Sequence, residues 1–448
     1  MTHLFGMNID EVLDSQAARE ILGSLSLRIG NRILQIVVSI MVARLLPLNE
    51  FGLFSIVISA VMVFQAFSTF GTPQFVQREI AIATSQQLWD RIKSLMRWSS
   101  LIVTLVCIAI LLALYVWECL GGLMLPENKN AFAVGFLIIP TMAFLQLWQA
   151  QLRGYGSIIA GQISETLVKP GLFILFVFVA ISTTNFPRSA IFVLVLQLIA
   201  TIFSLGLVVY LKYLKMGFLK VCKVERASHL NWLWSSSRFA LLSGLAILNN
   251  QIGILMVGAI SGKADAGVFT VAVKGANLLV VALTAANIAL APRMAKFYNE
   301  QCYDKLQKMI TRGYRAVALV TLPVFLLFVF AGKIFLSIFG PAFVIAWPAL
   351  VILSFGQYLF ILAGPMGTML SMAGHERITA LGMAISVLVT IGTGFLLIPL
   401  MGINGAAFAT VLGMMFWNVL LAYLCYKRLG IWTPVLGISR VKGSLRSQ

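Results

Sequence analysis

Apolar runs of about 20 residues recur along the whole chain, and they constrain its fold more than any other feature of the sequence. A run of this length forms a helix that spans the roughly 30 Å of hydrocarbon in a lipid bilayer. Composition agrees, because 60% of the 448 residues are apolar and only 11% are charged, too few to cover a soluble core of this size. Since backbone polar groups in lipid must be satisfied within the segment, we expect an all-α integral membrane protein.

The apolar runs predict twelve transmembrane helices, an even number that places both termini on the same side of the membrane. The expected limits are 20–46, 51–72, 96–118, 131–152, 158–182, 188–211, 236–260, 267–291, 314–339, 345–372, 378–399 and 403–426.

Lysine and arginine are distributed unevenly among the connections between these spans. Of the 33 in the chain, 24 lie in the termini, in connections on the same side or at the adjoining span ends. Five lie in connections or at span ends on the opposite side, and four lie deeper within spans. The positive-inside rule therefore predicts that both termini are cytoplasmic. The net charge of +18 follows from this topology and from contact with anionic lipid, so it requires no nucleic-acid partner.

An internal repeat relates the two halves of the chain. The turn after the first span, LPLNEFGLFS at 46–55, resembles the turn after the seventh, SGKADAGVFT at 261–270. Shifted by 215 positions, Glu50, Gly52, Phe54 and Ser55 match Asp265, Gly267, Phe269 and Thr270. Chance similarity of two glycine turns is the alternative interpretation.

The repeat predicts two six-helix lobes around a central cleft. Each half has an even number of spans, so the halves keep the same orientation and are related by a pseudo-two-fold axis along the membrane normal. The expected division is an N-terminal lobe at 1–214, a basic cytoplasmic linker at 215–235 and a C-terminal lobe at 236–448.

The sequence contains no recognisable catalytic, nucleotide-binding or metal-binding motif. There is no GxxxxGK[ST] phosphate loop and no cluster with metal-ligand spacing, so we expect no ATP-driven step, no cofactor and no metal. The outer connections are short, which argues against a membrane glycan polymerase or ligase, since enzymes of that kind usually carry a large outer loop. The remaining class is a secondary transporter, channel or flippase rather than an enzyme.

Charged residues inside spans are the most informative about function, because each costs roughly 2.5–3.5 kcal/mol to insert and usually faces a wet cavity. In the first span, polar residues recur at three- and four-residue steps and form one helical face, which includes Arg28, Asn31, Arg32 and Gln35. Arg32 lies about 21 Å below the outer end of the span. Arg28 is close enough to the cytoplasmic end for its side chain to reach the surface instead.

Two later spans carry further intramembrane charges. In the eighth span, Lys274 and Asn277 share a polar face, although Lys274 can also extend to the outer surface. In the fifth span, Glu165 precedes Lys169 by four residues, the spacing of a helical ion pair, and the two are candidates for ion coupling or for a neutralised structural pair. With four positive charges against one negative, the cavity is cationic and favours an anionic head group such as a phosphate or diphosphate.

The chain resembles the oligosaccharide flippases for bacterial polysaccharide repeat units, within the superfamily that includes multidrug and toxin extrusion transporters. The resemblance covers nearly the whole chain. It depends on the order and spacing of ARLLPLNEFGLFS at 43–55, QFVQREIA after the second span, RGYG from Arg153, AGVFTVAVKGANLL from Ala266, APRMAKFY from Ala291, GPMGTMLSMAGHER from Gly364 and GINGAAFAT from Gly402.

This resemblance implies a multi-pass protein of the bacterial inner membrane that moves undecaprenyl-diphosphate-linked oligosaccharides from the cytoplasmic to the periplasmic leaflet by alternating access. Lipopolysaccharide or exopolysaccharide would be the product, with a polymerase and chain-length machinery as partners. The similar lipid II flippases typically carry two more helices, which argues against a peptidoglycan role. The alternatives are an ion-coupled multidrug antiporter, in which Glu165 would be the coupling carboxylate, and a glycan polymerase or ligase.

Overall fold

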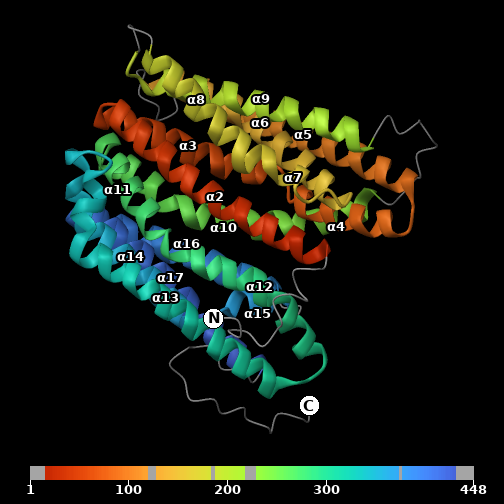
Figure 1. Cartoon of the computed structure of the whole chain (residues 1–448). Coiled ribbons are helices and arrows are strands. Elements are labelled where there is room, and N and C mark those ends of the chain that lie inside the picture. Colours follow the sequence, from red (N-terminus) through yellow and green to blue (C-terminus); the bar gives the residue numbers. More distant parts are fainter. Residues whose placement is uncertain (1–15, 120–127, 183–186, 217–228, 373–375, 430–448) are drawn as a thin grey trace. The chain divides into compact units, whose positions relative to one another are not determined.

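The computed structural model describes residues 16–119, 128–182, 187–216, 229–372 and 376–429, which form helices joined by turns, without β-strands (Figure 1). The fold is therefore all-helical, as the sequence predicts. The helices are α2 (Gln16–Leu45), α3 (Leu48–Ser68), α4 (Thr72–Ser85), α5 (Trp89–Cys119), α6 (Lys129–Gly154), α7 (Ala160–Ile163), a π-helix (Ser164–Val168), α8 (Lys169–Ser182), α9 (Ala190–Met216), α10 (His229–Ile260), α11 (Lys263–Ala276), α12 (Leu279–Asn299), α13 (Tyr303–Ser337), a 3-10 helix (Pro341–Ala346), α14 (Trp347–Ala363), α15 (Met366–Met372), α16 (Glu376–Met401) and α17 (Ile403–Leu429).

Ten helical segments of the described residues are long and apolar enough to cross a membrane, and the number becomes eleven when α11 and the start of α12 count as one bent span. These segments overlap the predicted second to twelfth spans. The tenth differs most from its expected limits of 345–372, because its helix ends at Ala363 and α15 begins only at Met366, after Gly364 with its positive φ. The first predicted span, 20–46, coincides with the 30-residue helix α2. Large apolar side chains on the outer faces are exposed, as on α13, where Phe330 is 83% exposed, and this is the surface that lipid covers.

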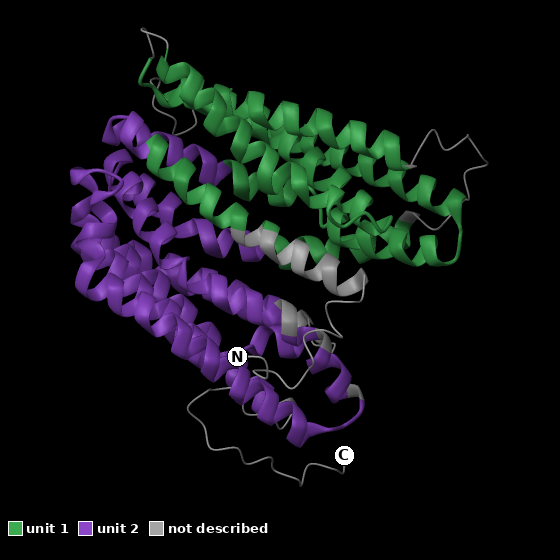
Figure 2. Ribbon diagram, in the orientation of Figure 1, with its two compact units in different colours: residues 1–42, 61–244 green, residues 43–60, 245–448 purple. Residues whose placement is uncertain are grey.

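The chain divides into two compact units (Figure 2). Unit 1 comprises residues 1–42 and 61–244, and unit 2 comprises residues 43–60 and 245–448. Helices α2, α3 and α10 therefore contribute residues to both units. The lobe limits expected from the sequence, 1–214 and 236–448, stay a prediction, and residues 217–228 of the expected linker lie outside the described residues.

Unit 1 is organised around the short amphipathic helix α4, which packs against α5 and α6. Its buried face, with Phe75 and Ile80, joins Trp98 of α5 and Leu152 of α6 in one apolar cluster. Helix α4 begins after Gly71, whose φ of 65° lies in the left-handed region. A Cβ at Gly71 would lie 2.2 Å from the backbone nitrogen of Ala240, so only glycine permits this turn against α10.

In unit 2, the two copies of the repeated turn lie against each other. A Cβ added at Gly267 would lie 3.1 Å from the Cα of Gly52, its partner in the repeat. The hydroxyls of the matched Ser55 and Thr270 both donate to the carbonyl four residues earlier, at 2.8 and 2.7 Å. Contact between equivalent residues is what a two-fold axis through this point produces, and it supports the repeat found in the sequence.

Helices α16 and α17 form an antiparallel pair in unit 2 that also packs against α14. Their approach is close because of two glycines. A Cβ at Gly405 would lie 2.1 Å from the carbonyl oxygen of Leu397, and one at Gly413 would lie 2.1 Å from the hydroxyl oxygen of Thr390. Small residues at such contacts allow helices in lipid to pack backbone against backbone.

Candidate functional site

The polar face predicted for the first span lies on α2. Arg32 and Gln35 are exposed and Asn31 is half-buried, and the Gln35 amide donates a 3.4 Å hydrogen bond to Asn31 Oδ1. Ile33 on the apolar face is also exposed, so both faces of this part of α2 are open. Arg28 lies within α2, but its side chain lies outside the described part of the structure. The local arrangement brings Asn31 and Gln35 together beside Arg32.

Glu165 lies in the π-helix Ser164–Val168, inside the span formed by α7 and α8. In the orientation that suits its neighbours, the Gln149 amide donates to Glu165 Oε2 at 2.9 Å and accepts from the Glu165 backbone N–H at 3.1 Å. Gln149 on α6 is fully buried, whereas Glu165 is exposed and Lys169 is half-buried. The α-helical spacing expected for Glu165 and Lys169 does not apply in a π-turn.

Sequence reasoning missed both the π-helix and the partner of Glu165. A π-turn has no simple sequence signature. Gln149 is one of several amide side chains inside the predicted spans, and the sequence pattern does not indicate which of them contacts Glu165. Short π-helices inside α-helices occur frequently at functional sites. The buried amide fixes the position of an exposed carboxylate within the membrane span.

In unit 2, Lys274 and Asn277 lie at a break between two helices. Helix α11 ends at Ala276, Asn277 caps it, and the start of α12 is bent from it by 47°. Lys274 is half-buried in the last turn of α11. Asn277 Oδ1 accepts a 3.3 Å hydrogen bond from the Gln357 amide of α14, which joins the break to a neighbouring span.

Asn277 lines a pocket of about 240 Å³ in unit 2, and Lys274 does not. The polar lining also includes Asn249, Asn250, Gln357 and Thr410 from α10, α14 and α17. The sequence places the amides of Asn249, Asn250 and Gln357 inside the predicted spans. That they line the same pocket depends on how the helices pack. Within the described residues, no group of three or more His, Cys, Asp or Glu side chains is arranged to hold a metal ion.

A buried polar network in unit 1 contains a lysine that the sequence places in a connection. Helix α9 continues past the predicted limit of the span, and Lys212 Nζ donates a 2.7 Å hydrogen bond to Gln151 Oε1. Gln151 is fully buried on α6 and donates to the Ser99 hydroxyl at 3.1 Å. Lys212 Nζ also lies 5.4 Å from the centre of the Trp148 ring, a cation–π contact.

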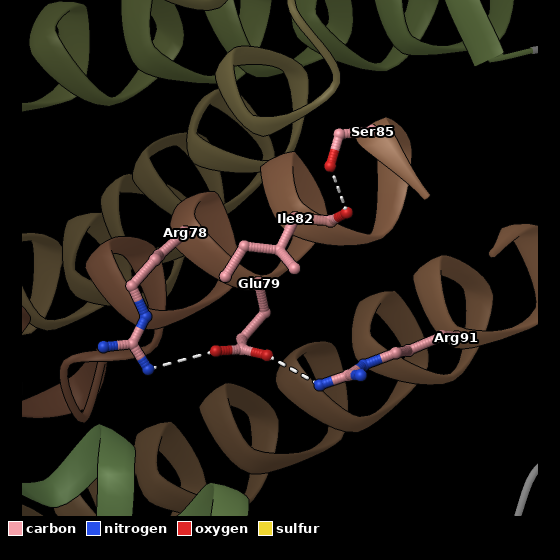
Figure 3. Close-up of polar contacts among 5 residues, drawn as sticks. All are labelled: Arg78, Glu79, Ile82, Ser85 and Arg91. Atoms are coloured by element: carbon pink, nitrogen blue, oxygen red, sulfur yellow. Dashed lines mark hydrogen bonds and ion pairs between the residues drawn. The ribbon is translucent and has the colours of Figure 1, made fainter. Parts of the chain in front are cut away.

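Glu79 of α4 forms an ion triad with two arginines in unit 1 (Figure 3). Glu79 is 8% exposed, and its carboxylate accepts from Arg78 at 3.0 Å and from Arg91 of α5 at 2.8 Å. Arg78 also lies 5.7 Å from the centre of the Phe239 ring. The triad joins α4 to α5, which is a structural rather than a substrate-binding arrangement.

Solved structures with the same fold are transporters. The chain matches an inward-facing multidrug resistance transporter of the multidrug and toxin extrusion family with a TM-score of 0.72 at 15% identity, covering 91% of this chain and 98% of that one. It matches a transporter of the same superfamily from Pyrococcus furiosus with a TM-score of 0.68 at 17% identity, covering 94% and 97%. Identities this low establish the fold alone, and no curated protein matches the chain significantly.

The family comparison covers most of the chain. Residues 17–298 match the family described as polysaccharide biosynthesis protein. This region extends from α2 through most of α12 and includes the polar face of α2, the π-helix and the broken helix with Lys274. Together, the family match and the fold show that the chain belongs to the polysaccharide biosynthesis protein family and has the fold of multidrug and toxin extrusion transporters.

Proposed function

We propose that the protein is a flippase that moves undecaprenyl-diphosphate-linked oligosaccharide repeat units from the cytoplasmic to the periplasmic leaflet for polysaccharide export. The observation that carries the proposal is the excess of cationic side chains inside the spans of a polysaccharide biosynthesis family member. Away from the ends of the predicted spans, there are four lysines and arginines, Arg28, Arg32, Lys169 and Lys274, and one carboxylate, Glu165. A diphosphate matches this charge, whereas a cationic drug would require carboxylates.

In the proposed mechanism, the polyprenyl tail stays in lipid while the diphosphate and sugars cross through a polar path. Arg28 and Arg32 of α2 and Lys274 of α11 act as successive anion sites during alternating access, with Asn31, Gln35 and Asn277 as uncharged hydrogen-bonding groups beside them. Arginine suits the first contact because its donor fork binds two phosphate oxygens at once. A cation or proton gradient drives the cycle, with Glu165 and Lys169 as the coupling pair.

This function assigns the protein to the bacterial inner membrane with both termini in the cytoplasm. Its substrate is supplied by glycosyl transfer onto a polyprenyl diphosphate on the cytoplasmic face. Its product is used by a polysaccharide polymerase and chain-length machinery on the outer face. The protein itself performs no covalent chemistry.

The direct test uses proteoliposomes that contain the purified chain and a fluorescent undecaprenyl-diphosphate oligosaccharide. The fraction of label accessible in the opposite leaflet is measured with and without an ion gradient. We expect translocation with the wild type and none with protein-free liposomes. A folded protein that moves no label under any gradient would refute the proposal.

A second candidate, an ion-coupled multidrug antiporter, is favoured by one observation. Glu165 is an exposed carboxylate within a span, and the Gln149 amide holds it in place. A carboxylate in that setting can bind a proton or a cation in exchange for a drug. If expression of the chain confers drug resistance, and Glu165→Gln abolishes it while the membrane level of the protein is unchanged, the antiporter is the better assignment.

A further inference from the structure

The pocket beside the α11–α12 break shares only Asn277 with the proposed anion path, and its chemistry differs from that of the path. None of the described residues that line the pocket has a charged side chain. Its volume of about 240 Å³ is below the roughly 300–1,000 Å³ of pockets for drug-sized ligands. The size and neutrality suit one small uncharged ring rather than a diphosphate or a large cationic drug.

Three amides on three different helices provide hydrogen-bonding capacity in this pocket. Asn277 Oδ1 accepts from Gln357, and Asn249 Oδ1 accepts from the Ser386 hydroxyl at 3.3 Å. An amide has two N–H donors and two acceptor positions on its oxygen. Within the described residues, the Asn249 and Asn277 amide nitrogens and the Gln357 amide oxygen are therefore available to a ligand that both donates and accepts hydrogen bonds.

Aromatic rings form another part of the pocket. Phe360 and Trp417 are stacked, with ring centres 6.1 Å apart and an interplanar angle of 28°. Gly382 lets the indole approach α16, because a Cβ there would lie 3.0 Å from Trp417 Cδ1. Flat apolar rings beside amides match the two surfaces of a sugar, whose C–H face is apolar and whose edge carries hydroxyls.

The helix break lies at the same place. Asn277 caps the end of α11, and it lines the pocket together with Val273 and Ala276 of the last turn of α11. In secondary transporters, substrate sites are typically built from discontinuous membrane helices. The break therefore gives a reason, independent of the lining chemistry, to regard the pocket as a ligand site.

We propose that this pocket binds one uncharged sugar ring of the lipid-linked glycan. The inference rests on the proposed flippase function and deepens it by separating sugar recognition from diphosphate recognition. Lys274 is three residues before Asn277, so their Cβ atoms are roughly 5–6 Å apart and Lys274 flanks the pocket. This spacing suits a glycosyl diphosphate, in which a single oxygen joins the sugar ring to the phosphate.

Other occupants fit less well. An alkyl chain would offer no hydrogen bond to the Asn249 and Asn277 amide nitrogens or to the Gln357 amide oxygen, and each unsatisfied polar group costs about 1–3 kcal/mol. A cation would find no carboxylate in the lining. A sugar satisfies the amides and covers the rings at the same time.

The test compares the binding of two lipids to the purified full chain in nanodiscs. One is undecaprenyl diphosphate without sugar, and the other is the same lipid carrying a single uncharged hexose. Gln357→Met removes the amide and keeps the volume of the side chain. We expect it to weaken binding of the glycosylated lipid about ten-fold and to leave binding of the sugar-free lipid within about two-fold.

Two further variants make the result specific. Asn249→Leu removes a second amide of similar size and should give the same selective loss. Gln251→Met makes the same chemical change one position from Asn250 on α10, at a residue that does not line the pocket, and should change neither affinity. Thermal unfolding of each purified variant verifies that it is folded, and a variant that fails this check is replaced by the other.

The outcomes separate this inference from the proposed function. If wild-type protein translocates the lipid-linked glycan but Gln357→Met and Asn249→Leu bind both lipids normally, the sugar pocket is refuted and the flippase stands. Equal weakening of both lipids would mean that the diphosphate occupies the pocket, which also overturns the inference. If the wild type neither binds nor moves either lipid, the proposed function itself fails.

Discussion

At the scale of single residues, Arg32 is the side chain on which the proposed anion path most depends. It is exposed on α2, and in the first span predicted from the sequence it lies about 6 Å farther along the helix axis than Arg28. An arginine at that depth is costly unless it meets water or an anion.

We expect Arg32→Ala to reduce polysaccharide export at least ten-fold, because the diphosphate loses its bidentate partner inside the span. The measurement is surface polysaccharide in a strain that depends on this chain, normalised to the amount of protein in the membrane. Arg188→Ala is the matched control, since Arg188 is exposed in a connection. Full export by Arg32→Ala would remove Arg32 from the path.

Lys274 tests whether charge alone is sufficient at the last of the three proposed anion sites. Lys274→Ala should lower the rate of translocation in proteoliposomes severalfold, whereas Lys274→Arg should keep most of it, because the positive charge is retained. The initial rate of label transfer distinguishes the two variants. An equal loss in both would indicate that the shape of the lysine, rather than its charge, is required.

At the scale of elements, α4 is held by charge as well as by its apolar face. Glu79→Gln removes the carboxylate shared by Arg78 and Arg91 and leaves two positive charges close together. We expect a loss of about 1–2 kcal/mol, reduced from the value of a fully buried pair because Arg78 and Arg91 are 55% and 34% exposed.

Thermal unfolding of the purified protein in detergent measures this loss as a lower Tm. The control is Asp90→Asn, which makes the same carboxylate-to-amide change at an exposed residue whose oxygen is 4.0 Å from Lys93 Nζ. The change in Tm caused by Asp90→Asn should be close to zero. Equal Tm values for the two variants would show that the triad contributes nothing to stability.

The contact between α3 and α11 depends on a backbone approach rather than on side chains. A Cβ at Gly52 would lie 1.7 Å from the carbonyl oxygen of Lys263, and a backbone atom cannot turn away as a side chain can. Gly52→Ala should therefore prevent unit 2 from packing and leave little folded protein after membrane extraction.

Size-exclusion chromatography of the extracted protein gives the folded fraction. Gly206→Ala is the control, because no atom lies within 4 Å of the added Cβ and alanine is the better helix former. If both variants elute as monodisperse peaks of equal height, the approach of α3 to Lys263 is not a requirement of the fold.

Much of the arrangement of elements is predictable from the sequence, because the length of an apolar run alone determines whether a helix can cross the bilayer. The predicted second to twelfth spans match helices of the structure. The break at Asn277 and the π-turn at Glu165 were not predicted, since neither interrupts the apolar pattern around it. The pocket could not be predicted from the sequence either, because it depends on which faces of α10, α14 and α17 pack together.

At the scale of the whole molecule, the distribution of basic residues predicts the orientation in the membrane. Cys119 at the end of α5 is exposed and belongs to the outer side in this topology, whereas Cys302 precedes α13 on the cytoplasmic side. A membrane-impermeant thiol reagent added to intact spheroplasts should label a variant that retains only Cys119 and should not label one that retains only Cys302.

Opening the cells before labelling is the control that shows Cys302 to be reactive. Label on Cys302 but not on Cys119 in intact spheroplasts would invert the topology. The predicted direction of transport, from the cytoplasmic to the periplasmic leaflet, would then be reversed with respect to the anion path.

The contact between the two copies of the repeated turn also bears on how the halves have diverged. If they arose by duplication of one ancestral gene, Gly52 and Gly267 descend from the same codon. Their surroundings now differ, because a methyl group at Gly52 would overlap the backbone of Lys263, whereas one at Gly267 would lie 3.1 Å from its nearest neighbours. Alanine at 267 requires its neighbours to shift by a few tenths of an ångström, whereas alanine at 52 overlaps a backbone atom outright. A random mutant library selected for export should therefore return alanine at 267 more often than at 52.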